Sequence, residues 1–434
     1  MIKQISKKRI SFYTFGCRLN QAETAVIKNS FQNGNYDVVD FTEPADVVVV
    51  NTCTVTENGD ADTRKLVSKI NRLNPHAKIA LVGCQAQIQK EKLTKLSNVY
   101  WVVGNAKKFD LAEILKEVDS SSEPRVIAPA IPRAAFTLPT AGIDTDHTRA
   151  NIKIQDGCDF FCSFCEIPYA RGRARSREFQ NILDEANILA EAGHREIILT
   201  GINVGTYANG QRNILAVIDE LEKIEKIERI RISSIEPTTI PRQLVERMAA
   251  PLKLCRYLHI PLQSGHDTIL QRMARKYTVA EFSNFVEFAK RTVKDICVGT
   301  DVIVGFPGET EEHFAATAEL LRNLPLDYFH VFSYSKRSLA QSRRLTDEIP
   351  REIIERRSQI LRDLSQRKRR IFYETQLGVT QNVLFENEKQ GEWIGFTDNY
   401  IRVKIKSTAN LANQLRTVKL QHINEQGVFG ILSE

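Results

Sequence analysis

Three cysteines fall within eight residues of this chain, and three phenylalanines stand between them, in the run DGCDFFCSFC that contains Cys158, Cys162 and Cys165. A structural zinc site takes four protein ligands, and the nearest histidines, His147 and His194, lie outside a compact finger spacing. A four-iron cluster usually takes four cysteines, so three would leave one iron open to another ligand. We therefore expect an iron–sulfur cluster here. Three buried structural cysteines, or a zinc knuckle, are the alternative.

The length and composition of the chain limit the class of protein to which it can belong. At 434 residues it is too long for one hydrophobic core, so we expect two or three domains. Hydrophobic residues make up 42% and charged residues 26%, which is typical of a soluble protein. No apolar run is long enough to cross a membrane, and the N-terminal MIKQISKKRI lacks the apolar stretch of an export signal. We therefore expect a cytoplasmic protein that does not bind a membrane. The net charge of +7 favours a polyanionic partner.

The first section of the chain, up to about residue 116, alternates strand and helix patterns. A cysteine follows within three residues of each of the first three long strands, which are predicted at Ile10–Phe15, Asp46–Val50 and Lys78–Val82. Crossovers of this length favour a parallel sheet, whose strands end at one shared edge where ligands bind. We therefore expect Cys17, Cys53 and Cys84 to converge. Three small apolar residues at unrelated strand ends are the alternative.

From residue 150 to about 336 the chain repeats strand–helix units. The predicted strands are Ile152–Gln155, Glu196–Leu199, Arg229–Ile232, Tyr257–Ile260, Gly299–Val304 and Tyr328–Phe332. Six units are fewer than the eight of a full barrel, so an open partial barrel is expected, with its chemistry at the carboxyl ends of the strands. Those ends carry polar residues that favour a site, including Thr200, Asn203, Ser234, Glu236, Gln263 and Asp301.

The last 60 or so residues show short alternating strands. Ile401, Val403 and Ile405 are expected to face a small barrel core, while Tyr400, Arg402 and Lys404 are expected to face outward. An outer face that is both aromatic and cationic suits stacking on bases and pairing with phosphates, so we predict RNA contact there. A plain surface strand would have a similar pattern.

Six motifs, in this order, resemble those of the radical S-adenosylmethionine (SAM) methylthiotransferases: YTFGCRLNQAET, NTCTVT, GCQAQ, KIQDGCDFFCSFCEIPYARGRARSR, PLQSG and TDVIVGFPGET. The resemblance covers nearly the whole chain. It implies an α/β protein with an N-terminal open parallel sheet that holds an auxiliary cluster (residues 1–118) and a linker (119–149). A central partial (β/α)6 radical-SAM barrel (150–372) and a small C-terminal β-barrel of the RNA-binding TRAM type (373–434) would follow.

The resemblance also implies two 4Fe–4S clusters, each with three cysteine ligands. Cys158, Cys162 and Cys165 would hold the catalytic cluster that cleaves SAM, and Cys17, Cys53 and Cys84 would hold the second. In this family the open iron of the second cluster carries a sulfur that one SAM methylates. A second SAM supplies the radical that abstracts hydrogen from C2 of an adenine. The residues expected to bind SAM are Phe164, against its adenine, and the polar Thr200, Asn203, Ser234, Glu236 and Gln263.

Within the family, FGCRLNQAET, NTCTVT and IPYARG are similar to the branch that modifies N6-threonylcarbamoyladenosine next to the anticodon of tRNA. Arg18 stands where that branch more often has lysine, and His266 follows PLQSG where a small polar residue is common. Another tRNA adenosine or an aspartate of a ribosomal protein is the alternative substrate. A non-catalytic iron–sulfur electron carrier or RNA-binding protein is the alternative from a different class. Expected partners are tRNA, an electron donor such as flavodoxin or ferredoxin, and a sulfur donor.

Four arginines alternate just after the cysteine run, and they are expected to hold a tRNA phosphate or the SAM carboxylate: Arg171, Arg173, Arg175 and Arg177. A solvated basic loop is the alternative. Cys255 and Cys297 fall outside both cysteine sets, and we expect them to be structural.

Overall fold

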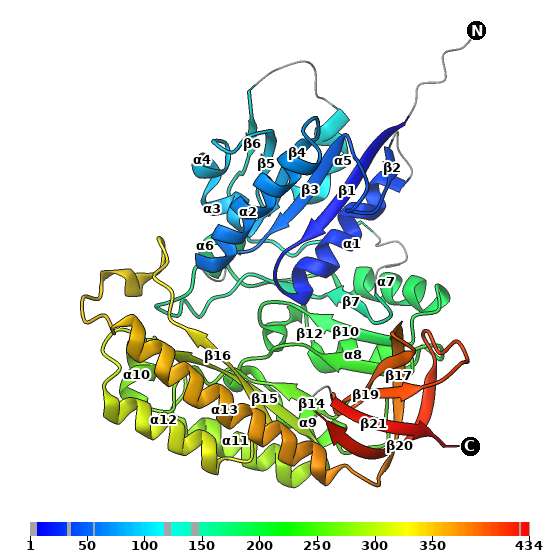
Figure 1. The fold of residues 1–434 in the computed structure, drawn as a ribbon, viewed down its shortest axis with the longest axis vertical. Helices are drawn as coiled ribbons and strands as arrows, with labels where there is room; N and C mark the ends of the chain where they lie inside the picture. The colour runs from blue at the N-terminus through cyan, green and yellow to red at the C-terminus, as the bar shows by residue number, and fades with distance from the viewer. Residues whose placement is uncertain are drawn as a thin grey trace.

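The computed structural model describes residues 7–32, 36–54, 57–116, 123–139, 147–424 and 427–433. Three parts follow one another along the chain: a first unit (residues 8–127), a central unit (150–375) and a C-terminal barrel (380–432). Figure 1 shows the first unit above the central unit, with the barrel beside the lower half. Among the described residues, no helix combines the length and the apolar character that crossing a bilayer requires.

The first unit is a parallel sheet of six strands in the order β2-β1-β3-β4-β5-β6. Its strands are β1 (Lys8–Thr14), β2 (Tyr36–Val38), β3 (Val47–Thr52), β4 (Lys78–Gly83), β5 (Val99–Val103) and β6 (Arg125–Ile127). Its helices are α1 (Arg18–Gln32), α2 (Glu57–Leu73), α3 (Cys84–Ile88), α4 (Lys90–Leu93), η1 (Lys108–Asp110) and α5 (Leu111–Lys116).

Both faces of this sheet are covered, which explains the unbroken apolar sequence of β3. Val47 and Val49 belong to the hydrophobic core on one face, and Val48 and Val50 to the core on the other. A strand buried on both faces reads as a continuous apolar run and not as an alternating one. The predicted parallel α/β sheet is confirmed.

The segment predicted as a linker, residues 119–149, is only partly a linker. Its residues 125–127 form β6, which pairs with β5 as the edge strand of the first sheet. Phe136 forms a bridge with Arg177 of the central unit. Residues 119–122 and 140–146 of this segment lie outside the described residues.

The central unit contains all six predicted strands, now with their observed bounds. They form two parallel sheets, β13-β10-β7 and β14-β15-β16, which the isolated bridges Ile230–Leu254 and Ser234–His259 link into one curved wall. The expected open partial barrel is therefore confirmed. Its strands are β7 (Ala150–Lys153), β10 (Glu196–Thr200), β13 (Arg229–Ile232), β14 (Tyr257–His259), β15 (Cys297–Val304) and β16 (Tyr328–Ser333).

Helices cover the outside of this wall and bury one large apolar core. Two of them, α11 and α12, begin with a capping box, in which Thr278 or Thr310 accepts a backbone N–H of the first turn. The helices are α6 (Ile167–Arg171), α7 (Phe179–Glu191), α8 (Ile214–Glu222), α9 (Arg242–Met248), α10 (Asp267–Arg272), α11 (Val279–Thr292), α12 (Glu311–Asn323) and α13 (Arg351–Thr375). Short elements are β8 (Gln155–Asp156), β9 (Arg175–Ser176), β11 (Ala208–Asn209), β12 (Arg212–Asn213), η2 (Val204–Thr206), η3 (Pro237–Thr239) and η4 (Gln341–Arg344).

The C-terminal barrel is closed, in the strand order β17-β18-β19-β21-β20. Its strands are β17 (Thr380–Lys389), β18 (Glu392–Thr397), β19 (Arg402–Lys406), β20 (Leu415–Asn424) and β21 (Gly427–Leu432). Ile401, Val403 and Ile405 are buried in its core, as their alternation predicts. The preceding helix α13 runs to Thr375, so the boundary expected between residues 372 and 373 falls inside a helix.

Candidate functional site

The loop that carries Cys158, Cys162 and Cys165 is folded back on itself after β8. Gly157 has a φ of +71°, and a Cβ there would lie 2.1 Å from the carbonyl oxygen of Arg173, so only glycine fits. The Cys158 N–H donates to the Gly172 carbonyl at 3.1 Å, and the Cys165 N–H donates to the Cys162 carbonyl at 3.0 Å. The backbone thereby holds the three cysteines in one compact turn.

Each sulfur of this loop accepts a hydrogen bond. The Phe160 N–H donates to Cys158 Sγ and the Ile167 N–H to Cys165 Sγ, both at 3.4 Å, and Arg275 Nη1 donates to Cys162 Sγ at 3.0 Å. Burial, together with the charge of the neighbouring sulfurs, raises the pKa of Cys158 to about 11 and that of Cys165 to about 12. Cys162 is buried, and Cys158 and Cys165 are partly buried. Clustered thiols that resist ionisation but accept hydrogen bonds from N–H donors suit an iron–sulfur cluster, because the positive charge of the iron compensates the thiolates.

Arg275 is a site residue that the sequence did not reveal. It joins Cys162 to Glu236, because its other terminal nitrogen is ion-paired with the Glu236 carboxylate. Burial raises the pKa of Glu236, although Arg275 acts against the shift. Nothing in the surrounding RMARKYT indicates this role, since the loop and Arg275 lie more than 100 positions apart and meet only in the folded barrel.

Besides Glu236, which pairs with Arg275, three of the residues predicted to bind SAM line cavities, and these three are divided between two cavities. Asn203 lines a cavity of about 380 Å³ together with Cys158 and Phe160, whereas Thr200 and Ser234 line a larger one of about 1100 Å³. Asn203 Oδ1 accepts from the Thr239 hydroxyl at 2.9 Å, while its Nδ2 is buried without a partner among the described residues.

The two other predicted SAM contacts have structural neighbours. Gln263 has a φ of +72°, and its backbone bonds to β15 on both sides, at the Asp301 carbonyl and the Ile303 N–H. Phe164 is half-buried and packs against the apolar cluster of Ile269, Met273 and Phe306.

The second cysteine set lies at one edge of the first sheet. Cys17 follows β1, Cys53 follows β3 and Cys84 follows β4, and these three strands are adjacent. A Cβ on Gly16 would lie 2.8 Å from Cys53 Sγ, so the segment before Cys17 packs directly on Cys53. Asn20 donates to the Phe15 carbonyl at 2.7 Å and to the Thr52 carbonyl at 3.2 Å, which ties the ends of β1 and β3 together.

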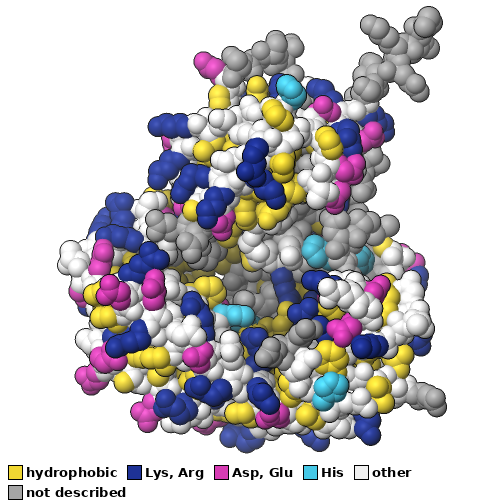
Figure 2. Space-filling model, viewed as in Figure 1, with side chains coloured by type: hydrophobic (Ala, Val, Ile, Leu, Met, Phe, Trp, Pro, Cys, Tyr) yellow, Lys and Arg dark blue, Asp and Glu magenta, His cyan; other side chains and the backbone are white. Residues whose placement is uncertain are grey.

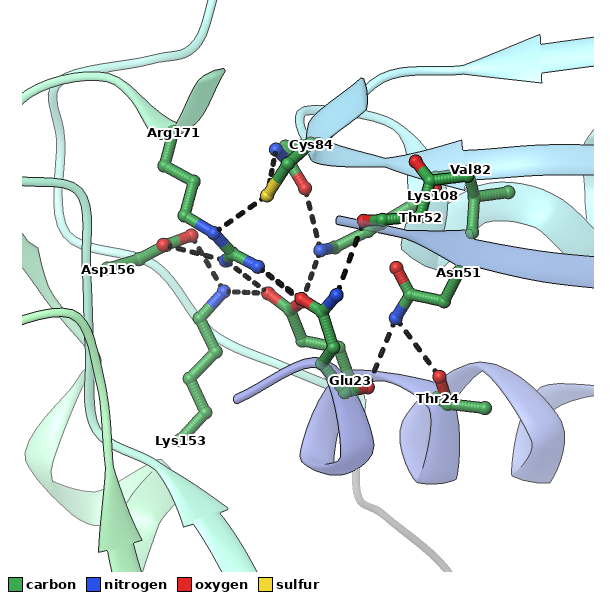
Figure 3. Close-up of polar contacts among 12 residues, drawn as sticks. Glu23, Thr24, Asn51, Thr52, Val82, Cys84, Lys108, Lys153, Asp156 and Arg171 are labelled. Carbon is green, nitrogen blue, oxygen red and sulfur yellow. Dashed lines mark hydrogen bonds and ion pairs between the residues drawn. The ribbon is translucent and has the colours of Figure 1, made fainter. Parts of the chain in front are cut away.

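Cys84 borders a buried ionic network, shown in Figure 3, that joins the first unit to the central unit. Glu23 is its centre: Lys108 Nζ lies 2.5 Å, Lys153 Nζ 2.7 Å and Arg171 Nη1 2.8 Å from its carboxylate oxygens. Burial opposes ionisation of Glu23, but the three cations hold its pKa well below the ordinary value. Burial lowers the pKa of Lys108 to about 8.

Arg171 links this network to both cysteine sets. Its Nε donates to Cys84 Sγ at 3.1 Å, and its Nη1 lies 3.0 Å from Asp156, which stands two residues before Cys158. Four cations face the carboxylates of Glu23 and Asp156: Arg171, the two lysines of Figure 3, and Arg175. The surplus positive charge beside Cys84 suits an anionic metal–thiolate group, so this set also fits a cluster.

Two of the four arginines expected to hold an anionic ligand are buried structural residues. Arg171 is 1% exposed and bonds to the network above; Arg177 is fully buried and paired with Glu185. The prediction that these two side chains hold a tRNA phosphate or the SAM carboxylate is therefore wrong. Arg175 is largely buried and lies 3.1 Å from Asp156, whereas Arg173 is half-exposed beside Asp159.

The expected outward face of the C-terminal barrel is only partly present. Arg402 is exposed, as predicted. Lys404 is outside the apolar core of the barrel, but it is buried and paired with Glu392 on the neighbouring strand at 3.1 Å, so it is not the exposed cation that an RNA-binding face requires. Tyr400 has a φ of +65° and turns toward the other two units, with its ring 4.5 Å from that of Tyr257 and its hydroxyl accepting from Arg18 at 2.6 Å.

A cavity of about 1100 Å³ opens where the three parts meet, which we call the junction cavity. Cys17 and Arg18 line it from the first unit, Ser233 and His259 from the central unit, and further residues from the barrel, among them Phe396, Tyr400 and Arg402. Figure 2 shows this face hollowed at mid-height, with basic and histidine side chains at the rim. The hollow brings a residue of the second cysteine set into the same space as the interior of the partial barrel.

One group of side chains on the wall of this cavity could also hold a cation. The ligand atoms of His259, Asp301 and His330 all lie within 4.8 Å of one another. His259 Nε2 is 2.9 Å from Asp301 Oδ1, and its Nδ1 lies 3.2 Å from the Tyr328 hydroxyl. These two contacts engage both ring nitrogens of His259 within the protein.

Cys255 and Cys297 are both buried, and burial raises the pKa of each thiol. This placement supports the structural role expected for them.

Two family models match the chain. The model described as the radical SAM superfamily matches residues 152–321, and the one described as uncharacterized protein family UPF0004 matches residues 9–104. Among solved structures, the radical SAM methyltransferase TsrM from Kitasatospora setae superposes with a TM-score of 0.53 over 75% of each chain at 16% identity. That likeness shows the fold.

Curated relatives match over nearly the whole length. The threonylcarbamoyladenosine tRNA methylthiotransferase MtaB of Aquifex aeolicus is 37% identical over 94% of this chain and 100% of its own. MtaB of Bacillus subtilis is 36% identical over 95% of this chain and 93% of its own. A tRNA-2-methylthio-N(6)-dimethylallyladenosine synthase of Christiangramia forsetii is 30% identical over 89% of this chain and 85% of its own. With its radical SAM match and this full-length similarity, the chain belongs to the radical-SAM methylthiotransferase family of enzymes.

Proposed function

We propose that this enzyme methylthiolates C2 of N6-threonylcarbamoyladenosine next to the anticodon of tRNA, in the cytoplasm. The observation that carries the proposal is that Arg171 contacts Cys84 of one set of three cysteines and Asp156, two residues before the other set, and that Cys17 of the first set borders a large cavity. The printed names of the two relatives at 36 and 37% identity support the nucleoside.

Each cysteine set would hold one 4Fe–4S cluster with an open iron. Bound clusters and SAM would supply the radical that breaks a C–H bond beyond the reach of acid–base catalysis, and the sulfur that forms the new C–S bond. The protein's own part is placement. Arg275 donates to Cys162 and Arg171 to Cys84, so each set has a guanidinium that stabilises negative charge on its sulfurs.

For SAM we propose contacts on the carboxyl-terminal side of the partial barrel. Asn203 has a buried amide nitrogen without a protein partner and lies in the same cavity as Cys158, which supports its role. The other proposed contacts are Phe164, Thr200, Ser234, Glu236 and Gln263. Among the basic residues, Arg173 and Arg402 are exposed and remain candidates for tRNA contact. An external reductant and a sulfur donor complete the reaction.

The proposal is tested with anaerobically reconstituted protein, SAM and a reductant. Three substrates are compared: an anticodon stem–loop with N6-threonylcarbamoyladenosine, the same stem–loop with dimethylallyladenosine, and a ribosomal-protein peptide with an acceptor aspartate. We expect the 2-methylthio product with the first substrate. A product only from the stem–loop with dimethylallyladenosine, or only from the peptide, would overturn the assignment.

A further inference from the structure

Buried polar atoms without partners gather on the wall of the junction cavity. Nη1 of Arg18 and Nη1 of Arg149 are both buried, and neither has a hydrogen-bond partner among the described residues. The same holds for Ser233 Oγ and His194 Nε2, which also line the cavity. Leaving a buried donor without a partner is unfavourable, and more so when the donor is charged. Several of them around one cavity indicate a polar ligand.

The charge of the wall indicates the sign of that ligand. Among the described residues that line the cavity, four arginines, Arg18, Arg149, Arg369 and Arg402, stand against two carboxylates. Both carboxylates have partners: Glu386 lies 2.5 Å from Arg149 Nε, and Asp301 lies 2.9 Å from His259. The cavity wall therefore has a surplus of positive charge, which suits an anion.

Tyr400 contacts both unsatisfied guanidinium groups. Arg18 Nη2 donates to its hydroxyl at 2.6 Å, and the Arg149 guanidinium carbon is 5.8 Å from its ring centroid and 4.5 Å from that of Phe396. The Tyr400 and Phe396 rings stack on each other at 5.2 Å. In this arrangement each guanidinium keeps a terminal nitrogen unused, and the planar guanidinium fork matches a carboxylate.

We propose that Arg18 and Arg149 form the subsite for the carboxylate on the amino-acid arm of the substrate nucleoside. This rests on the proposed function, because a threonylcarbamoyl arm ends in a carboxylate whereas a dimethylallyl arm is apolar. Arg18 directly follows Cys17, so the subsite would hold the arm of the nucleoside beside the second cysteine set. These two arginines would then determine which hypermodified adenosine the enzyme accepts.

The test compares two anticodon stem–loops that differ by one charge: N6-threonylcarbamoyladenosine and its carboxyl methyl ester. Dissociation constants are measured with reconstituted protein, and KM and kcat are measured in parallel. We expect the wild type to bind the acid at least about tenfold tighter than the ester, since one charge-assisted hydrogen bond contributes about that much. R18M and R149M should lose this preference because they bind the acid more weakly, while their binding of the ester stays the same. The weaker binding should raise KM for the acid and leave kcat unchanged.

Two further variants make the test selective. R18K keeps the positive charge and should retain most of the preference, whereas R351M, at an exposed arginine at the start of α13, should leave it unchanged. If R149M is unstable because Glu386 loses its partner, R18M carries the test, since Arg18 is bound to the hydroxyl of Tyr400 and not to a carboxylate.

The outcomes separate this subsite from the proposed function. Equal binding of acid and ester by the wild type would overturn the subsite, even if both are methylthiolated. An equal loss of acid and ester binding in R18M and R149M would also overturn it, and would assign the guanidinium groups to a tRNA phosphate. Absence of product with preserved discrimination in binding would support the subsite and contradict the proposed reaction.

Discussion

Arg171 Nε lies 3.1 Å from Cys84 Sγ, while the same guanidinium is 3.0 Å from Asp156 beside the other cysteine loop. One buried side chain therefore contacts a cysteine of one candidate cluster site and a carboxylate two residues before the other. Because Arg171 belongs to the central unit and Cys84 to the first unit, this contact also fixes how the two units are placed.

Replacing Arg171 with methionine should destabilise the protein strongly. The change leaves Glu23 and Asp156 with one cation fewer, and breaking a buried ion pair on one side costs about 3–5 kcal/mol. Denaturant unfolding followed by circular dichroism measures the loss. R173M is the matched control, since Arg173 is half-exposed and should cost far less. Equal midpoints for the two variants would contradict the role of the network.

Mutation of the two cysteine sets should have different effects on the reaction. Replacing Cys158, Cys162 and Cys165 with alanine should abolish formation of 5'-deoxyadenosine from SAM. Replacing Cys17, Cys53 and Cys84 should abolish methylthiolation but leave some SAM cleavage, and each triple variant should bind about half the iron of the wild type. Chromatography and iron analysis give both readouts. C255A, in the buried structural thiol, is the control, and full activity of the second triple variant would refute the two-cluster account.

Glu196 should contribute to the loss of stability in acid. Burial opposes its ionisation, but Arg231 and Arg149 lower its pKa from the ordinary 4.5 to about 2. Between these two values the unfolded chain binds a proton that the folded protein does not, so stability is lost as the pH falls from about 4.5 to 2. The contribution is roughly 3 kcal/mol.

The variant E196Q tests this directly. It should be less stable than the wild type at pH 7, and the difference in unfolding free energy should narrow as the pH falls toward 2. E228Q, at a more exposed carboxylate paired with Arg195, should follow the wild-type curve. A pH-independent difference for E196Q would contradict the assignment.

Arg402 and Lys404 should differ in their effect on tRNA binding. R402A removes an exposed cation and should lower the slope of log Kd against log salt by about one. K404M should leave the slope unchanged, because Lys404 is buried and paired with Glu392. Binding titrations over a series of salt concentrations measure both. The same slope for both variants would place the tRNA footprint elsewhere.

Sequence reasoning found the parts of the fold that follow local rules. The six strands of the central unit and the convergence of β1, β3 and β4 on one edge follow from periodicity and from the geometry of parallel crossovers. The positions of the cysteines at those strand ends could be predicted for the same reason.

The contacts of the side chains that hold the sites together could not be predicted in this way. Arg171 and Arg177 look like members of one exposed basic run, yet their partners Glu23 and Glu185 come from other elements and draw them inside. Lys404 follows an alternating pattern, but pairing with Glu392 on the adjacent strand buries it. Arg275 has no local signal, because its role depends on contacts more than 100 residues away.

The central claim is tested most directly by nucleoside analysis of tRNA from cells with this gene deleted and then restored. We predict that deletion removes 2-methylthio-N6-threonylcarbamoyladenosine while N6-threonylcarbamoyladenosine accumulates. Restoring the wild-type gene, but not a copy with alanine at Cys158, Cys162 and Cys165, should return the product. An unchanged methylthio-nucleoside profile after deletion would contradict the account.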